Sequence, residues 1–328
     1  MSNLKLSLGH STSDRSQALE DGRVIPEGIE LTVSTSAAGD IFQRMRQTGE
    51  FDISEMSISH YLIDRCLENP KYIAIPVFTK MFRNAYVYLN RHSGIKAPGD
   101  LKQKKVGIPR YSTSGTLWIR GILQHEYGVA PSDIRWYMGG KEGPKQQDRK
   151  ALGAPEDLPL QQVPPSIALS DMLVAGEIDA LITPVDPPWE WKNHPNVGRL
   201  WPNYREVEMD YYRRTRIFPI MHTVVIKQEI YNANPWVAKS MFHAFCEAKK
   251  LCGYISYSSG AANMLPWSIA EYEATAALMG ENFYQYGAEA NRAALETTIQ
   301  YSYEQKLSSR KVSFNELFAE ETSGLLDS

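Results

Sequence analysis

A short polar turn separates a strand pattern from a helix pattern in residues 104–123. The apolar run VGIP is followed by Ser112, Thr113, Ser114 and Gly115, after which apolar residues recur at helical spacing. A helix start directs several backbone N–H groups and a partial positive charge toward one point, which suits a carboxylate or a phosphate. An N-cap without a ligand uses the same residue types. The segment therefore predicts either an anion site or a plain cap.

Two arginines near this turn are candidates for gripping a carboxylate. Arg110 directly precedes the turn, and Arg83 follows a strand pattern that ends before residue 79. A guanidinium can bind a planar carboxylate through two parallel hydrogen bonds. A solvated surface charge is the alternative for both residues. For Arg120, inside the helix, we expect the surface role.

Four ionisable residues stand at or near the ends of predicted strands. His10 ends the first strand, where ligands lie in open parallel sheets, although a capping loop is the alternative. Glu55 lies among apolar residues in FDISEMS, and burial there would raise its pKa and make it an acid or a base. His222, in IFPIMHTVVI, is either a hydrogen-bonded core residue or a proton carrier. Asp186, before two prolines, is a further candidate, which we assign to substrate binding.

Motifs for metals and nucleotides are missing from the sequence. It contains no HExxH, no HxH, no GxGxxG, no Walker pattern and no GxSxG. A divalent ion held by His10, Glu55 and His222 is left open. We therefore expect no cofactor, without excluding a divalent metal.

Composition describes an ordinary globular protein. With 328 residues the chain exceeds the usual size of one domain, and its net charge of −3 gives no electrostatic reason to bind nucleic acid or an anionic membrane. No run of about 18 apolar residues occurs, as a membrane span would need. The first residues lack the pattern of a secretory signal, and the three cysteines are widely spaced. We expect a cytoplasmic protein.

Strand and helix patterns alternate along the chain, which predicts an α/β fold with two lobes. In the first part we expect strands at 4–8, 29–35, 51–57, 72–78 and 85–89, with a helix at 40–48. A second series has strands at 105–109, 134–137 and 179–183, and helices from 115 and at 167–175. Residues 142–165 lack any period, which predicts a surface excursion. We expect a return strand at 216–226 and a helix at 235–254. Lobe 1 then comprises residues 1–92 and 205–328, including a helical C-terminal region, lobe 2 comprises 93–204, and a ligand cleft lies between them.

Four phrases of the sequence carry a resemblance to a known family. They are KKVGIPRYSTSGTLWIRGILQHEYGV, AGEIDALI, RTRIFPIMHTVVI and LPWSIAEYEATAALMGENFYQYGAEANRAALE. Together they resemble 4,5-dihydroxyphthalate decarboxylases. The resemblance implies the two-lobed fold of type II periplasmic binding proteins. It also implies a carboxy-lyase of phthalate catabolism that converts 4,5-dihydroxyphthalate to 3,4-dihydroxybenzoate (protocatechuate) and carbon dioxide.

Such a reaction needs groups that hold a carboxylate and a group that protonates a ring carbon. We assign the catalytic role to His10, Glu55 and His222. Substrate binding is assigned to Arg83, Arg110, Ser112, Thr113, Ser114 and Asp186.

Other functions of the same fold remain open from the sequence. The chain could capture an aromatic carboxylate without turnover, or decarboxylate a related hydroxylated aromatic acid. An enzyme of the thiamine-precursor type would want histidine-rich and cysteine-rich motifs that the sequence lacks. A homo-oligomer is also left open.

Overall fold

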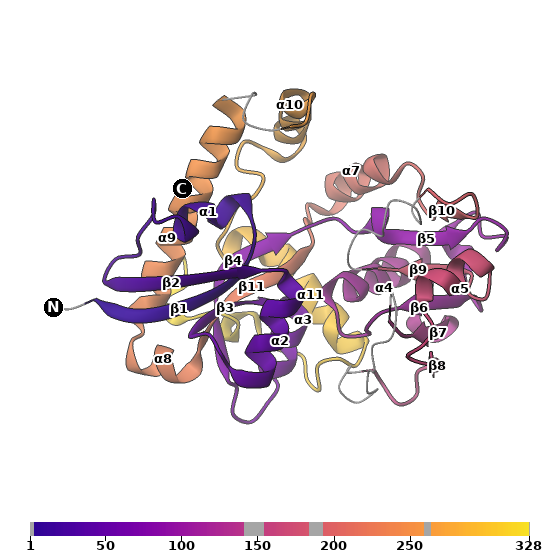
Figure 1. Ribbon diagram of the computed structural model, residues 1–328, viewed down its shortest axis with the longest axis horizontal. Coiled ribbons are helices and arrows are strands. Elements are labelled where there is room, and N and C mark those ends of the chain that lie inside the picture. Colours follow the sequence, from indigo (N-terminus) through magenta and orange to yellow (C-terminus); the bar gives the residue numbers. More distant parts are fainter. Residues whose placement is uncertain (1–2, 141–153, 184–192, 259–263, 328) are drawn as a thin grey trace. The chain divides into compact units, whose positions relative to one another are not determined.

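The computed structural model describes residues 3–140, 154–183, 193–258 and 264–327, with the backbone alone for 254–258 (Figure 1). It consists of two compact units. Unit 1 comprises Met1–Lys80, His222–Glu296 and Val312–Ser328, and unit 2 comprises Met81–Met221 and Thr297–Lys311. These bounds differ from the expected boundaries at 92 and 205. The reason is that the strand after Lys80 pairs with strands of the second sheet, so the chain enters unit 2 at Met81.

Unit 1 is built on a five-stranded sheet of order β2-β1-β3-β11-β4. Strand β1 pairs in parallel with β2 and β3, whereas β11 runs antiparallel to β3. Apolar side chains such as Leu8, Ile29 and Ile53 are fully buried, which explains why these runs become strands. The strands are β1 (Leu4–Ser11), β2 (Ile29–Ser36), β3 (Ile53–Ser57), β4 (Tyr72–Lys80) and β11 (Ile220–Lys227).

Helices surround the strands of unit 1 (Figure 1). In α2, Ile41 and Met45 form the buried face, and Gly49 ends the helix in the left-handed conformation that favours glycine. The helices are α1 (Gln17–Glu20), α2 (Ala38–Thr48), α3 (Ile58–Asp64), α8 (Gln228–Ala233), α9 (Trp236–Ser258) and α10 (Ser268–Met279), and α11 (Arg292–Glu304) contributes residues to both units. No described helix is long and apolar enough to cross a membrane.

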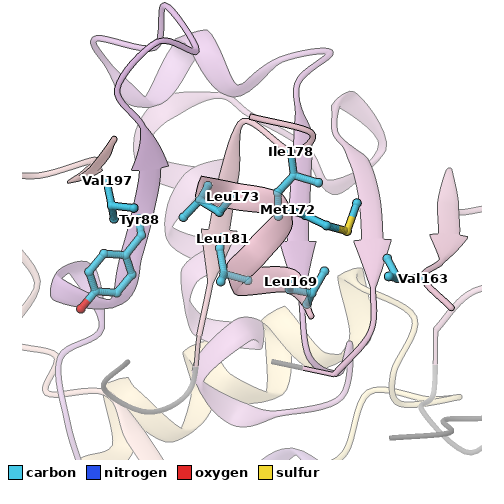
Figure 2. Close-up of a cluster of buried hydrophobic side chains, with 8 residues drawn as sticks. All are labelled: Tyr88, Val163, Leu169, Met172, Leu173, Ile178, Leu181 and Val197. Atoms are coloured by element: carbon cyan, nitrogen blue, oxygen red, sulfur yellow. The ribbon is translucent and has the colours of Figure 1, made fainter. Parts of the chain in front are cut away.

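Unit 2 is built on a six-stranded sheet of order β10-β5-β9-β6-β7-β8. Its strands are β5 (Val87–Asn90), β6 (Lys105–Ile108), β7 (Arg135–Met138), β8 (Leu160–Gln162), β9 (Ala180–Ile182) and β10 (Val197–Arg199). Its helices are α4 (Ser114–Tyr127), α5 (Leu169–Ala175) and α7 (Tyr204–Thr215). One apolar cluster of this unit consists of Tyr88, Val163, Leu169, Met172, Leu173, Ile178, Leu181 and Val197 (Figure 2).

Strand β8 corrects the expectation of an irregular excursion over residues 142–165. It pairs in parallel with β7, although Gln161 and Gln162 are exposed. An edge strand with exposed polar side chains has no apolar alternation, so its sequence gives no strand signal. Residues 141–153 lie outside the described residues.

Arg120 was expected on the surface, and this expectation is wrong. Its side chain is buried, its Nη2 donates to the carbonyl of Tyr111 at 2.7 Å, and its Nε donates to Gln305 Oε1 at 2.7 Å. The guanidinium also lies over the ring of Tyr111, 3.6 Å from its centroid. Burial lowers the pKa of Arg120 to about 10. The position faces inward because residues 114–123 of α4 are all buried, which helical periodicity alone does not show.

Gly121 allows α4 to approach Tyr301 closely. A Cβ at Gly121 would lie 2.0 Å from the Tyr301 ring, whereas a Cβ at Gly39 of α2 would meet nothing within 4 Å. We expect Gly121→Ala to lower the free energy of unfolding by about 1–3 kcal/mol through overpacking. The control Gly39→Ala should raise it by about 0.5–1 kcal/mol, since alanine favours the helix. Urea unfolding followed by circular dichroism measures both, and a Gly121→Ala variant as stable as wild type would contradict the packing.

Candidate active site

The three predicted catalytic residues lie on neighbouring strands of unit 1. His10 is near the end of β1, Glu55 is in the middle of β3, and His222 is near the start of β11. Because β11 is antiparallel to β3, with Val224 opposite Glu55, the side chains of Glu55 and His222 emerge on the same face of the sheet. The topology thus places two imidazoles beside one carboxylate.

The carboxylate of Glu55 accepts four hydrogen bonds from three directions. Its Oε1 accepts from Thr79 Oγ1 at 2.8 Å and from His222 Nδ1 at 2.6 Å. Its Oε2 accepts from the Ser11 amide at 2.8 Å and from the Ser11 hydroxyl. Two carboxylate oxygens offer about four lone-pair sites. All of these lone-pair sites are therefore occupied by protein donors. Water is not needed for this, and Glu55 is only 1% exposed.

Glu55 is an ionised group, which corrects the expected direction of its pKa. Burial alone raises this pKa, but the charges of His10 and His222 and the hydrogen bonds from His222 and Ser11 outweigh it. Together they hold the pKa of Glu55 well below its ordinary value. The sequence showed the apolar neighbours of Glu55 and not the donors, so it predicted a raised pKa. In the structure Glu55 is thus an anion that accepts a hydrogen bond from His222, and its catalytic role stays a prediction.

His222 is held by Glu55 through one ring nitrogen and is the more accessible histidine of this cluster. Because the ionised Glu55 can only accept, the Nδ1 of His222 carries hydrogen, and this leaves Nε2 for a proton transfer. The side chain is 17% exposed, so it is partly accessible. Phe42 contacts the ring edge-on, with 4.9 Å between the ring centroids. A carboxylate that fixes the tautomer of a histidine is a recurrent arrangement for acid–base catalysis.

His10 is more deeply placed than His222. Its Nδ1 lies 2.7 Å from the carbonyl of Ser11 and 3.2 Å from Ser16 Oγ, and 3.9 Å from Glu55 Oε2. Since a carbonyl only accepts, Nδ1 carries the hydrogen here too. His10 also borders a small polar hollow, shared with Glu55, whose cavity volume is about 10 Å³. That is about the room that one water molecule needs.

The predicted carboxylate-binding turn lies in unit 2. Helix α4 begins at Ser114, with Thr113 as an extended N-cap whose hydroxyl pairs with Thr116 Oγ1 at 2.7 Å. The Thr113 hydroxyl makes no capping bond to the helix N–H groups. The side chains of Ser112 and Ser114 are buried. This geometry agrees with a helix start whose amides are not covered by its own N-cap side chain.

Arg83 lies against this helix start. A Cβ at Gly115 would be 3.2 Å from Arg83 Nε. The guanidinium is buried, its Nε donates to Met221 Sδ at 3.0 Å, and burial lowers the pKa of Arg83. Arg110 is partly buried, and Asp186 lies outside the described residues. The structure therefore brings Arg83 and the turn together, and their role in binding stays a prediction.

Ser11 and Thr79 were missed as site residues by the sequence reasoning. Both are hydroxyl residues near the C-terminal ends of strands, β1 and β4. That position is the signal that could have marked them, because the ends of neighbouring strands meet at one edge of a sheet.

The metal site that the sequence left open has no support in the geometry. Among the described residues, no group of three or more His, Cys, Asp or Glu side chains is arranged to hold a metal ion. The lone pairs of Glu55 are taken up by hydrogen-bond donors. The cluster of His10, Glu55 and His222 forms a hydrogen-bonded network, and the expectation of catalysis without a cofactor stays a prediction.

We expect Glu55→Gln to lower the free energy of unfolding by about 3 kcal/mol at pH 7, because buried donors and histidines lose their charged acceptor. The pKa of Glu55 is lower in the folded protein than the ordinary value of 4.5. Its stabilisation is therefore present above about pH 4.5 and is lost as the pH falls through the folded-state pKa. The difference between variant and wild type, measured by urea unfolding, should shrink below pH 4.5.

Glu30→Gln is the matched control, because Glu30 forms an exposed ion pair with Lys5 on the same sheet. We expect a change within about 0.5 kcal/mol. Equal stability of Glu55→Gln and wild type at pH 7 would show that the carboxylate is not the stabilising anion described above.

Solved structures resemble this chain in fold. The alkanesulfonate-binding protein SsuA from Xanthomonas axonopodis pv. citri, bound to MOPS, has a TM-score of 0.54 at 13% identity and covers 98% of both chains. The aliphatic sulphonate-binding protein SsuA from Escherichia coli also has a TM-score of 0.54, at 14% identity, over 98% of this chain and 99% of that one. A Candida albicans protein with the generic periplasmic binding protein fold has a TM-score of 0.50 at 13% identity, over 99% of this chain and 98% of that one. The expected α/β fold of the periplasmic-binding-protein type is confirmed.

Curated relatives agree with the resemblance found in the sequence. No family model matches the chain. The 4,5-dihydroxyphthalate decarboxylase of Comamonas testosteroni is 33% identical over 320 residues, which cover 97% of each chain. The enzyme of the same name from Pseudomonas putida is 32% identical over 214 residues, covering 65% of this chain and 83% of the relative. The chain therefore belongs to the family of 4,5-dihydroxyphthalate decarboxylases.

Proposed function

We propose that this protein is a carboxy-lyase that converts 4,5-dihydroxyphthalate to 3,4-dihydroxybenzoate and carbon dioxide in the breakdown of phthalate. The observation that carries the proposal is the 33% identity to a decarboxylase of that name over 97% of both chains. The cluster of Glu55 and His222 supplies an acid–base group of the type that the reaction needs.

The substrate itself supplies the electrons for this reaction. Each carboxylate of 4,5-dihydroxyphthalate stands para to a hydroxyl, whose oxygen lone pair pushes electron density toward the carbon that bears the carboxylate. A proton adds to that carbon, the bond to the carboxylate breaks, carbon dioxide leaves, and the electron pair of that bond restores the aromatic ring. No electron-sink cofactor is required by this route. We therefore propose that catalysis rests on side chains alone, without excluding a divalent metal.

His222 is the proposed donor of the proton to the ring carbon. Its Nδ1–H donates to Glu55, and the anion balances the charge of the imidazolium before transfer. His10, whose Nδ1 also carries hydrogen, offers Nε2 as an acceptor for the phenol. Each histidine is thus held in one tautomer by an oxygen acceptor of the sheet.

We assign substrate binding to the residues that were named for it from the sequence. Arg83 lies against the start of α4, where Ser112, Thr113 and Ser114 gather amides and hydroxyls. A guanidinium beside a helix N-terminus suits the retained carboxylate. Arg110 and Asp186 stay proposed contributors.

We place the protein in the cytoplasm. Its three cysteines, Cys66, Cys246 and Cys252, are all free thiols, as is usual in a reducing compartment. Self-association into a homo-oligomer is compatible with this proposal and is not required by it.

Purified protein should release one carbon dioxide per 4,5-dihydroxyphthalate consumed and form 3,4-dihydroxybenzoate. Chromatography of the products with manometric or isotopic detection of carbon dioxide measures both. Diacid that binds and is recovered unchanged would contradict the enzyme and favour a binding protein. Turnover of only a different hydroxylated aromatic acid would contradict the substrate.

His222→Gln should lower kcat by about 10²- to 10⁴-fold, because the proton donor is lost while a hydrogen bond to Glu55 can remain. Binding of phthalate, which lacks the hydroxyls and cannot react by this route, should change little. The control is His243→Gln, since His243 is exposed on α9, and it should keep full kcat. Steady-state kinetics and calorimetry separate the two effects, and full turnover by His222→Gln would remove His222 from the mechanism.

A further inference from the structure

A cavity of about 440 Å³ in unit 1 has no role in the reaction as described so far. Its lining includes Arg15, Lys249, Tyr272, Phe283, Tyr284 and Asp327. These residues come from the turn after β1, from α9, from α10 and from the segments that follow α10 and end the chain. Helices α9 and α10 can be followed in Figure 1. The volume is in the range of pockets that bind small organic ligands.

Arg15 gives this cavity a group that recognises anions. Its Nη1 donates to Asp14 Oδ1 at 2.9 Å, and its Cζ lies 4.4 Å from the centroid of the Tyr284 ring. Stacking uses the face of a guanidinium and leaves the N–H groups at its edge for a carboxylate. The side chain of Asp14 is 65% exposed, so water weakens its hold on the arginine. Among the described residues, no other acceptor is bound to the Arg15 guanidinium.

Aromatic rings give the same cavity a surface for an aromatic ligand. Tyr272 and Phe283 meet edge to face, with 5.5 Å between their centroids, and both are partly buried. Lys249 forms an ion pair with Asp327, so its charge is already balanced. Lys250, the other lysine of the lining, is exposed, so the partly buried Arg15 is the cation of this cavity that is best placed to take a ligand carboxylate.

Arg15 also connects this cavity to the candidate active site. The same side chain lines the small hollow that His10 and Glu55 share. A carboxylate held by Arg15 would thus lie at the border of that hollow. A role limited to stacking on Tyr284 would not require Arg15 to reach both spaces.

We propose that the cavity beside Arg15 is a binding site for an aromatic carboxylate, with Arg15 as the partner of the carboxylate and with Tyr272 and Phe283 flanking the ring. The ligand class, a benzene carboxylate, rests on the proposed function. The site itself rests on the cavity and its lining.

Titration calorimetry with phthalate tests this site in the full chain. Because phthalate also binds at the candidate active site in our proposal, we expect wild type to bind two phthalate molecules, and Arg15→Gln to weaken one of these two binding events about ten- to a hundredfold, as loss of a charged hydrogen bond implies. Phe283→Ala should weaken binding several-fold, and benzoate should respond to both substitutions in the same direction. Arg23→Gln is the control, because Arg23 is exposed and paired with Asp21, and it should bind as wild type does.

Phthalate binding that is equal in wild type, Arg15→Gln and Phe283→Ala would overturn the inference, whether or not wild type releases carbon dioxide. Loss of one of the two phthalate-binding events in these two variants, in a protein without turnover, would keep the site and overturn the proposed function. Should Arg15→Gln unfold, Arg15→Lys provides the second measurement. It keeps the charge and loses the planar fork, and an unchanged affinity in it together with Phe283→Ala would also overturn the site.

Discussion

A carboxylate removed from water must be compensated at the place where it is buried, and Glu55 imposes this constraint on unit 1. Isolated burial of an ionised group costs several kcal/mol, so the anion persists only where donors are already in position. Here they come from Ser11 on β1, Thr79 on β4 and His222 on β11. A shift of any of these strands by one residue would turn its donor to the other face of the sheet. Stability and catalytic geometry therefore depend on the same four hydrogen bonds.

Glu55 and His222 differ in what each can do within the cluster. The pKa of Glu55 is held low and Glu55 fixes the tautomer of His222, whose Nε2 is the atom that we propose as the proton donor. The arrangement holds one ring nitrogen of the histidine while the other stays available. A glutamate acid, as expected from its apolar neighbours alone, would have needed a site without these donors.

The sequence located the candidate catalytic residues because position along a strand is a local property. His10, Glu55 and His222 stand in periodic apolar runs, and strand ends of an α/β sheet converge. The direction of the pKa shift of Glu55 could not be predicted from the sequence, because the donors to its carboxylate lie 44, 24 and 167 residues away. The predictions for strand β8 and for Arg120 were wrong for a related reason. Strand β8 is an edge strand whose exposed side chains do not alternate with apolar ones. Arg120 is buried because it pairs with Gln305, which lies 185 residues away in the sequence. Local pattern predicts elements, whereas long-range pairing decides which charged side chains are buried.

A shared fold and a shared activity are separate properties of these proteins. The sulfonate-binding proteins share the architecture at 13–14% identity, and a shared architecture alone does not transfer an activity. Capture of an anion requires donors that stay protonated, such as amides and arginine. Breaking a carbon–carbon bond requires in addition a group that gives up a proton and regains it. We propose that the pair of Glu55 and His222 meets that second requirement in this chain, because its anion is held by the sheet and its imidazole is partly accessible.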